Sequence, residues 1–298
     1  MAQTRLSALP RLLVTGATGM VGNALIPVLL GAGYAVRASA RHAPLASWAI
    51  HPRCEFLAHD LDTDPAPLLH GIDVVVHMAA RAHVMRETAT DPWSENRRIN
   101  TVATLRLADA AAAAGVGHFL YTSTIKVNGE ATGTLPFSES DEPHPEDAYG
   151  TSKLEAEQGL IARAASGAMG VTILRPPLIY GRGLKGNLAS LARAIERGFP
   201  LPLGAVNNRR SLVYAGNLAD AILTCIRRSC SGSRVYLVSD GEDVSTPELI
   251  RAIAAAMQCR PRLLAIPPGL LRAAGALTGR TAAVNRLLGS LTVDITRI

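Results

Sequence analysis

A tyrosine and a lysine four residues apart are the side chains of this sequence best suited to acid–base chemistry. They stand in the run Tyr149-Gly150-Thr151-Ser152-Lys153, and on a helix this spacing places both side chains on one face. An ammonium group beside a phenol stabilises the phenolate and lowers the pKa of the tyrosine. A tyrosine tuned in this way passes a proton to or from an alcohol oxygen. A run of hydroxyls, Tyr121-Thr122-Ser123-Thr124, ends an expected strand upstream and offers a hydrogen bond to the same oxygen.

A glycine-rich turn near the start of the chain predicts a dinucleotide site. Gly16, Gly19 and Gly22 follow an apolar strand and open a helical pattern that continues through Leu30. The first glycine permits the tight turn, the second lets the backbone approach a pyrophosphate, and the third allows close helix packing. The N–H groups of the helix N-terminus then face the phosphates. The alternative is an ordinary glycine-rich turn.

The end of the second expected strand bears on which dinucleotide binds. NAD sites usually carry an acidic residue there for the ribose 2′-hydroxyl, but Val36-Arg37-Ala38-Ser39-Ala40-Arg41 contains none. Arg41 or Arg37 is suited to a 2′-phosphate, so we expect NADP(H), with NAD(H) as the alternative. Both arginines are alternatively solvated surface residues. Asp60, after the third expected strand, is placed to meet the adenine, or else caps a loop.

Apolar runs and helical patterns alternate along the first part of the chain. We expect strands over residues 11–15, 34–40, 54–58, 72–78, 118–123 and 171–175, and helices ending at about residue 30 and covering about 100–114 and 149–165. This alternation predicts an α/β fold, a doubly wound parallel Rossmann sheet. After about Tyr180 the segments shorten and glycine and proline become frequent. We expect residues 1–180 to form the NAD(P)-binding domain, with a partial return at about 210–240, and residues 181–298 to form a smaller α/β substrate lobe over the cleft.

Composition limits the classes of partner. The 298 residues include 48% hydrophobic and 18% charged residues and have a net charge of +6, with 30 basic against 24 acidic residues. The arginines are scattered and not interleaved with aromatic residues, so we expect small polyanions and no nucleic acid as partners. No apolar stretch of about 18 residues predicts a membrane span. There is no signal peptide pattern, and the four cysteines match no zinc or redox spacing, so we expect a cytoplasmic protein without a metal.

Taken together, these motifs resemble the extended short-chain dehydrogenase/reductases, in the branch of the nucleotide-sugar epimerases and dehydratases. The resemblance covers nearly the whole chain. Its carriers are residues 15–22, Asp60, His77-Met78-Ala79-Ala80, Asn100, residues 122–129, Tyr149 to Lys153, Arg175-Pro176 and Arg210.

The resemblance implies a role for each matching residue. Tyr149 is the acid/base, Lys153 holds the nicotinamide ribose and tunes Tyr149, and Thr124 is the catalytic hydroxyl, with Ser123 as the fallback. The implied cofactor contacts are Gly16, Thr18, Gly19, Met20, Val21, Gly22, Arg41, Asp60, Leu61, Ala79, Ala80, Asn100, Tyr149, Lys153 and Pro176. The resemblance implies that Asn187 and Arg210 contact the nucleotide diphosphate of the substrate. We also expect Arg81, Ser123 and Lys126 to contact the substrate. Arg81 and His83 follow a strand into the cleft region and are alternatively cofactor contacts, and Lys126 is alternatively a solvated lysine.

The resemblance also bears on the reaction. Dehydratases of this branch carry an acidic pair directly after the catalytic hydroxyl, but here Ile125 and Lys126 follow Thr124. The missing acid after the second strand favours a reductase with exchangeable NAD(P)H. Runs such as Lys185-Gly186-Asn187 are similar to UDP-sugar 4-reductases of surface polysaccharide synthesis. We therefore expect reduction of UDP-4-keto-6-deoxy-N-acetylglucosamine.

Two other functions remain open. The first is a UDP-sugar 4-epimerase of the UDP-glucose/UDP-galactose type, with tightly bound NAD. The second is a non-catalytic dinucleotide-binding protein, although such relatives typically lack the tyrosine or the lysine, and Tyr149 and Lys153 are both present. Many relatives form homodimers through an arrangement that includes the Tyr149 helix. Relatives also continue with a further helix where this chain stops at Ile298, so we expect a shortened C-terminus.

Overall fold

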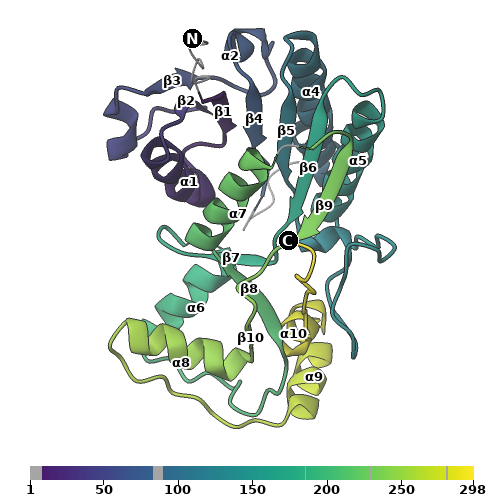
Figure 1. The fold of residues 1–298 in the computed structure, drawn as a ribbon. Coiled ribbons are helices and arrows are strands. Elements are labelled where there is room, and N and C mark those ends of the chain that lie inside the picture. The colour runs from purple at the N-terminus through teal and green to yellow at the C-terminus, as the bar shows by residue number, and fades with distance from the viewer. Residues whose placement is uncertain (1–8, 83–89, 185, 229, 280) are drawn as a thin grey trace, which may run out of the picture.

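A seven-stranded parallel sheet forms the larger part of the molecule (Figure 1). The computed structural model describes residues 9–82, 90–184, 186–228, 230–279 and 281–298; His83 and Lys185 lie outside these residues. The strand order is β3-β2-β1-β4-β5-β6-β9, and every adjacent pair is parallel. The strands are β1 (Arg11–Thr15), β2 (Ala35–Ala40), β3 (Cys54–Ala58), β4 (Val74–His77), β5 (His118–Thr122), β6 (Gly170–Arg175) and β9 (Ser233–Leu237). The predicted α/β fold with a doubly wound parallel sheet is thus confirmed.

Helices cover both faces of this sheet. On one face, α1 (Met20–Gly31) and α7 (Ala215–Arg227) pack on Leu12, Val14 and Val36. On the other face, α2 (Ala66–Leu69), α4 (Ala103–Ala113) and α5 (Ala148–Ala164) pack on Leu13, Val75 and Phe119. Successive residues of a strand point to opposite faces, so β1 sends alternate leucines and valines into the two cores. This double burial is the reason why the strands read as continuous apolar runs.

The connection from β4 to α4 differs from the sequence expectation. One helical segment was expected at about residues 100–114. The structure adds α3 (Pro92–Asn96), which Asp91 caps by accepting bonds from two backbone N–H groups, and η2 (Arg97–Val102), which is π-helical. No periodic apolar pattern marks these turns, because most of their side chains are polar. Short 3₁₀ turns, η1 (Ser47–Ile50) and η3 (Ile125–Val127), occur elsewhere.

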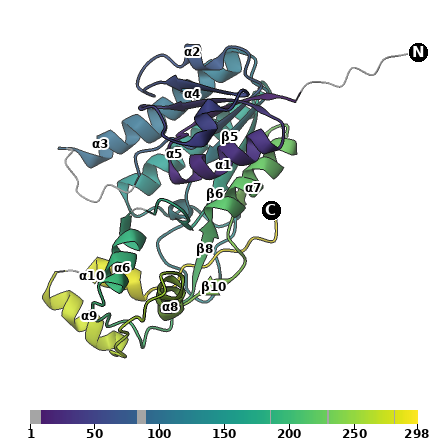
Figure 2. The same ribbon diagram turned by 90° about the vertical axis from the view of Figure 1, so that its left-hand side faces the viewer.

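A smaller lobe lies below the sheet in both Figure 1 and Figure 2. Its three-stranded sheet, in the order β10-β8-β7, consists of β7 (Leu178–Tyr180), β8 (Arg210–Tyr214) and β10 (Asp243–Val244). Its helices are α6 (Gly186–Glu196), α8 (Thr246–Ala256), α9 (Pro268–Leu277) and α10 (Thr281–Leu288). Between β8 and β10 the chain crosses back to the large sheet, where α7 packs on α1 and β9 forms the last strand.

The C-terminal residues join the lobe to the large sheet. Leu291 and Val293 pack with Ile125 and Leu237 in a small apolar cluster. The backbone at Val293 pairs with Phe137, and that at Leu291 pairs with Arg210. These contacts hold the lobe against the carboxyl ends of β5 and β9, where ligands of such sheets bind.

Candidate active site

The glycine-rich turn after β1 adopts the close geometry that its sequence predicts. Gly16 has φ +71°, and an added Cβ there would lie 2.7 Å from the backbone nitrogen of Ala79. At Gly22, in the first turn of α1, an added Cβ would lie 2.4 Å from the carbonyl oxygen of Ala17. Gly19 is the N-cap of α1 and supplies no side-chain cap, so N–H groups of the first turn stay available for an anion. The residues Thr18, Met20 and Val21 of this turn are at least partly exposed. The turn therefore has the shape and donors that a pyrophosphate requires.

Arg37 in β2 and Arg41 directly after it have different surroundings. Arg37 is buried, and its guanidinium donates to the Glu55 carboxylate at 3.0 Å and to the carbonyl oxygens of Leu68 and His70, both at 2.9 Å. The expectation that Arg37 is able to meet a 2′-phosphate is therefore wrong, because its donors are used inside the fold. Arg41 is exposed directly after β2. It is the only one of the two that is placed to meet a ligand.

Tyr149 and Lys153 lie in the first turns of α5, which the Asp147 side chain caps by accepting from the backbone N–H of Gly150 at 2.7 Å. The Lys153 ammonium is buried and donates to the carbonyl oxygen of Thr122 at 2.8 Å. It also lies 4.2 Å from the centre of the Tyr121 ring, a cation–π distance. The fold therefore holds Lys153 at the carboxyl end of β5.

The pKa values of this pair differ from the simple expectation. Burial lowers the pKa of Lys153 to about 7, although the nearby Glu157 carboxylate opposes the change. Burial raises the pKa of Tyr149, and the negative charge of Asp147 raises it further. The expected lowering of the tyrosine pKa by the lysine is thus not found, because burial and the Asp147 charge both raise the pKa of Tyr149. Tyr149 holds its proton in this state of the protein.

Several hydroxyls gather at the end of β5. Thr124 accepts from the backbone N–H of Lys126 at 3.3 Å and so caps η3. Among the described residues, the hydroxyls of Ser123, Thr122 and Tyr121 are buried without a hydrogen-bond partner. Both predicted candidates, Thr124 and Ser123, are therefore near the Lys153 contact, and Ser123 has an uncommitted hydroxyl. Pro176, a predicted cofactor contact, is buried nearby and accepts from the backbone N–H of Ile125 at 2.9 Å.

Lys126, a predicted substrate contact, takes part in an ion-pair cluster. Its ammonium donates to Glu130 at 2.5 Å and to Asp147 at 2.6 Å. Burial alone would lower the pKa of Lys126, but the bonds to Asp147 and Glu130 raise it overall. Because Asp147 caps α5, Lys126 acts on the position of the Tyr149 helix. Ile125 and Lys126 carry no carboxyl group, so neither residue after Thr124 supplies the acid of a dehydratase.

A buried ion pair between Arg175 and Glu157, close to Lys153, was not predicted from the sequence. Arg175, at the end of β6, donates to both Glu157 oxygens at 2.5–3.1 Å and to the side-chain oxygen of Asn128 at 3.0 Å. Arg175 and Glu157 are both buried. Glu157 follows Lys153 by one helical turn, so the same spacing rule that found the tyrosine–lysine pair points to it.

His77 ends β4 and is a hydrogen-bonded core residue. Its two ring nitrogens lie 2.7 Å from the Thr15 hydroxyl and 2.9 Å from the Thr104 hydroxyl. Burial, and then the charge of Lys153, lower its pKa to about 3. The imidazole is therefore neutral and links the end of β1 to helix α4.

Asn100, in η2, binds the segment that follows β4. Its side-chain oxygen accepts from the backbone N–H of Arg81 at 2.8 Å, and its amide donates to the Ser152 hydroxyl at 3.0 Å. Ala79 and Ala80, both predicted cofactor contacts, precede Arg81 in this segment. Asp60 and Leu61 follow β3, and one Asp60 oxygen accepts from the backbone N–H of Asp62 at 3.1 Å, which is the loop-cap alternative. Asp60 and Leu61 thus follow β3, and Ala79 and Ala80 follow β4, whereas Asn100 reaches the same segment from η2.

The substrate contacts predicted for the lobe lie on two of its elements. Asn187 is exposed in the first turn of α6. Arg210, at the start of β8, donates to the carbonyl oxygens of Arg286 at 2.6 Å and Gly289 at 3.3 Å. Burial lowers the pKa of Arg210, and the negative charge of Glu130 opposes this change. Arg210 is thus partly engaged within the lobe.

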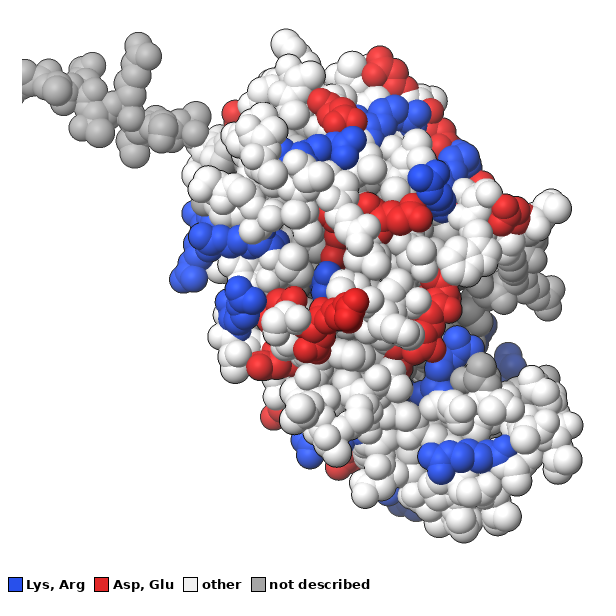
Figure 3. All heavy atoms as spheres, turned by 90° about the vertical axis from the view of Figure 1, so that its right-hand side faces the viewer, with Lys and Arg blue, Asp and Glu red and all other residues white. Residues whose placement is uncertain are grey.

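The described residues contain no group of three or more histidine, cysteine, aspartate or glutamate side chains that would hold a metal ion. Within the same residues, no helix is long and apolar enough to cross a membrane. Figure 3 shows one face of the molecule, on which acidic and basic side chains are interspersed. The absence of a nucleic-acid partner and the cytoplasmic location stay predictions.

The chain is similar to known proteins in both sequence and structure. Residues 12–239 match the model of the NAD dependent epimerase/dehydratase family. A UDP-glucose 4-epimerase of Vibrio cholerae is 43% identical over 291 residues, which cover 95% of this chain and 87% of that protein. A GDP-6-deoxy-D-mannose reductase of Pseudomonas aeruginosa is 32% identical over 273 residues, or 88% and 85% of the two chains.

A solved structure described as MoeE5 in complex with UDP-glucose and NAD is 28% identical to this chain. It superposes with a TM-score of 0.76, covering 96% of this chain and 90% of that one. A Thermus thermophilus UDP-glucose 4-epimerase in complex with NAD has a TM-score of 0.75 at 24% identity and supports the fold.

Proposed function

Because the chain belongs to the NAD-dependent epimerase/dehydratase family, we propose that it is a UDP-sugar 4-epimerase. Members of the extended short-chain dehydrogenase/reductases related to it are nucleotide-sugar epimerases and reductases, and it is an enzyme of this kind. The observation that carries the proposal is the 43% identity to a UDP-glucose 4-epimerase over 95% of the chain. The buried Lys153, one helical turn from Tyr149 at the end of β5, supports it.

The site fits a nicotinamide dinucleotide. The crowded glycines Gly16 and Gly22 admit close backbone approach, and the uncapped N-terminus of α1 offers N–H groups to the pyrophosphate. Asp60 and Leu61 would hold the adenosine end, and Lys153 the nicotinamide ribose. When bound, the dinucleotide supplies the hydride chemistry at C4 of the sugar. The chain itself binds and orients the dinucleotide and the sugar, and it moves a proton.

We propose that Tyr149 is the residue that exchanges a proton with O4 of the sugar. Its raised pKa keeps the phenol protonated, so it is ready to donate when a C4 carbonyl becomes an alkoxide. In the opposite direction the O4 proton goes to the phenolate form of Tyr149, so the phenol must first give up its proton, and the Lys153 ammonium would stabilise that phenolate. The Lys153 pKa of about 7 lets this ammonium exchange a proton near neutral pH. Thr124 or Ser123 donates a hydrogen bond to O4.

We propose NAD as the resident dinucleotide. MoeE5, which this chain resembles, was solved with NAD, and the preference for NADP predicted from the sequence finds no support among these relatives. The structure also removes Arg37 from the residues able to meet a 2′-phosphate. NAD that stays bound returns the hydride to the same sugar, as an epimerase requires.

A 4-reductase is the second candidate, and Arg41 is the observation that favours it. Arg41 is exposed after β2, and no acidic residue stands in β2 for a ribose 2′-hydroxyl. UDP-4-keto-6-deoxy-N-acetylglucosamine would then be the substrate. Arg81, Lys126, Asn187 and Arg210 are the residues we assign to the UDP-sugar in either case, with Lys126 acting through Asp147.

The presence of both Tyr149 and Lys153 argues against a non-catalytic dinucleotide-binding protein. We further propose a homodimer that includes α5. Exposed apolar side chains on α3, η2 and α5 support such a contact: Trp93, Val102 and Ile161. Light scattering of the purified protein tests it.

The two enzymatic candidates differ in whether nicotinamide is consumed. We expect the purified protein, without added cofactor, to interconvert UDP-glucose and UDP-galactose at constant absorbance at about 340 nm. Loss of one NADPH or NADH per molecule of UDP-4-keto-6-deoxy-N-acetylglucosamine, with no interconversion, would instead establish the reductase. Comparing dissociation constants for NADH and NADPH tests the cofactor, and tighter NADPH binding contradicts NAD.

A further inference from the structure

The loop that follows β3 is fixed to a helix that comes much later in the chain. Asp60 and Leu61, assigned to the adenosine end of the dinucleotide, begin this loop, and Asp62 and Thr63 continue it. The Asp60 carbonyl oxygen accepts from the Thr63 backbone N–H at 2.9 Å and from its hydroxyl at 2.6 Å. Asp60 Oδ1 accepts from the Asp62 N–H at 3.1 Å. These bonds make residues 60–63 one compact turn. A contact that fixes the position of Asp62 therefore also fixes the position of Asp60.

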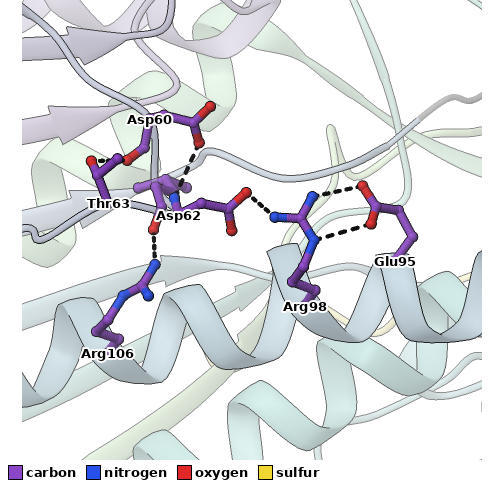
Figure 4. Close-up of polar contacts among 7 residues, drawn as sticks. Asp60, Asp62, Thr63, Glu95, Arg98 and Arg106 are labelled. Atoms are coloured by element: carbon purple, nitrogen blue, oxygen red, sulfur yellow. Dashed lines mark hydrogen bonds and ion pairs between the residues drawn. The ribbon is translucent and has the colours of Figure 1, made fainter.

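Two arginines of the η2–α4 helix hold this turn (Figure 4). One guanidinium nitrogen of Arg98 pairs with the Asp62 carboxylate, while two others bind both Glu95 oxygens at 3.0 Å and 2.7 Å. The bidentate bond to Glu95 fixes the plane of the guanidinium and aims its remaining donor at the loop. Arg106, further along α4, donates to the carbonyl oxygen of Leu61. Both side chains point from the helix to the loop in Figure 4.

The same helical turn contacts the opposite end of the site. Asn100 binds the Ser152 hydroxyl at 3.0 Å, and Thr101 donates to the Ser152 carbonyl oxygen at 2.8 Å. Ser152 stands beside Lys153 on α5. The turn that carries Arg98, Asn100 and Thr101 is π-helical, and π turns are frequent at functional sites because they redirect side chains. It therefore spans from the adenosine loop to the catalytic helix.

We propose that Arg98 is a positioning residue that clasps the residue 60–63 loop over the adenosine end of the dinucleotide and slows its release. This inference rests on the proposed use of a nicotinamide dinucleotide. Arg98 and Asp62 are 46% and 38% exposed, so water and salt screen their attraction. A partly exposed ion pair of this kind slows the release of the dinucleotide but does not prevent it.

The release rate of NADH tests the clasp. Each protein is loaded with NADH and mixed with a large excess of NAD⁺, and loss of NADH fluorescence gives the rate. We expect Arg98→Gln to release NADH about two- to fivefold faster than the unaltered protein, the range for half-exposed ion pairs. Arg98→Lys, which keeps the charge but loses the bidentate bond to Glu95 that aims the donor at Asp62, should recover only part of the retention, and added salt should narrow the difference.

Arg97→Gln is the matched control. Arg97 is the preceding residue of the same turn and also makes one exposed ion pair, but with Glu155 on α5 at 2.9 Å. We expect its NADH release to match that of the unaltered protein. Asp62→Asn should speed release as Arg98→Gln does, and the double variant Asp62→Asn/Arg98→Gln should be faster by less than the product of the two effects.

The following results would contradict the proposed role of Arg98 or the proposed function. An unchanged release rate in Arg98→Gln overturns the clasp, as does an equal acceleration in Arg97→Gln, which would show a general effect of surface charge. A change in kcat at saturating NAD, without a change in release, would place Arg98 in the chemistry and also overturn it. If the unaltered protein bound neither NADH nor NADPH, the proposed function itself would fail.

Discussion

The Lys153 ammonium donates a hydrogen bond to the backbone carbonyl oxygen of Thr122, 2.8 Å away. This bond joins helix α5 to the end of β5, where the hydroxyls of the site gather. It also gives a buried cation a partner that carries only a partial negative charge, which explains why desolvation dominates the pKa of Lys153.

The depressed Lys153 pKa predicts a pH-dependent stability. Between about pH 7 and the usual lysine value of 10.5, the unfolded chain holds a proton that the folded chain has lost. The free energy of unfolding therefore rises with pH, by about 2 kcal/mol between pH 7 and pH 9. Below pH 7 both states hold the proton and the dependence ends. Urea unfolding of the unaltered protein and of Lys153→Met should show this gain only in the former; equal pH slopes would contradict it.

Replacing Tyr149 by phenylalanine removes the proposed proton donor and leaves the ring in place. We expect kcat to fall by about 10²- to 10⁴-fold, while NADH binding changes little. Steady-state kinetics and NADH fluorescence measure the two quantities. Tyr236→Phe, on the edge strand β9, is the control and should retain activity. Unchanged turnover in Tyr149→Phe would remove this residue from the mechanism.

Gly22→Ala and Gly31→Ala lie on the same helix and should behave in opposite ways. At Gly22 the new Cβ would lie 2.4 Å from the Ala17 carbonyl oxygen, so the turn and helix must separate. We expect a loss of about 1–3 kcal/mol in stability and weaker NADH binding. At Gly31 nothing lies within 4 Å, and the variant should be as stable or slightly more stable. Thermal unfolding with and without NADH decides; a stable, tightly binding Gly22→Ala would refute the close-approach argument.

Glu157→Gln should be far more damaging than Glu155→Gln on the same helix. Glu157 and Arg175 are 1% and 6% exposed at their side chains, so the neutral amide leaves a buried guanidinium without its counter-charge. We expect a loss of about 3–5 kcal/mol in the free energy of unfolding. The Glu155 pair with Arg97 is exposed, and its removal should cost at most about 1 kcal/mol. Similar urea midpoints for both variants would show that the buried pair contributes little.

Local patterns were enough to predict most of the large sheet. Strands such as Val74–His77 are buried on both faces, and that burial requires a continuous apolar run which is visible in the sequence. The glycine-rich turn and the Tyr149–Lys153 spacing are also local, because a tight turn and one helical turn each involve only neighbouring residues. The polar helix α3 and the π turn η2 have no such pattern and were missed.

Which groups are available for chemistry depended on contacts between distant residues. Arg37 donates its hydrogen bonds to Glu55 and to carbonyl oxygens near α2. Lys126 forms an ion pair with Asp147, and Arg98 forms one with Asp62. The protonation of Tyr149 and Lys153 likewise depends on burial, which arises only when α5 packs against the sheet. The sequence by itself was enough to predict the fold and to single out Tyr149 and Lys153 as the proposed reacting pair, since both rest on short-range patterns. Only the tertiary structure decided their charge and partners, since desolvation and long-range ion pairs exist only in the packed chain.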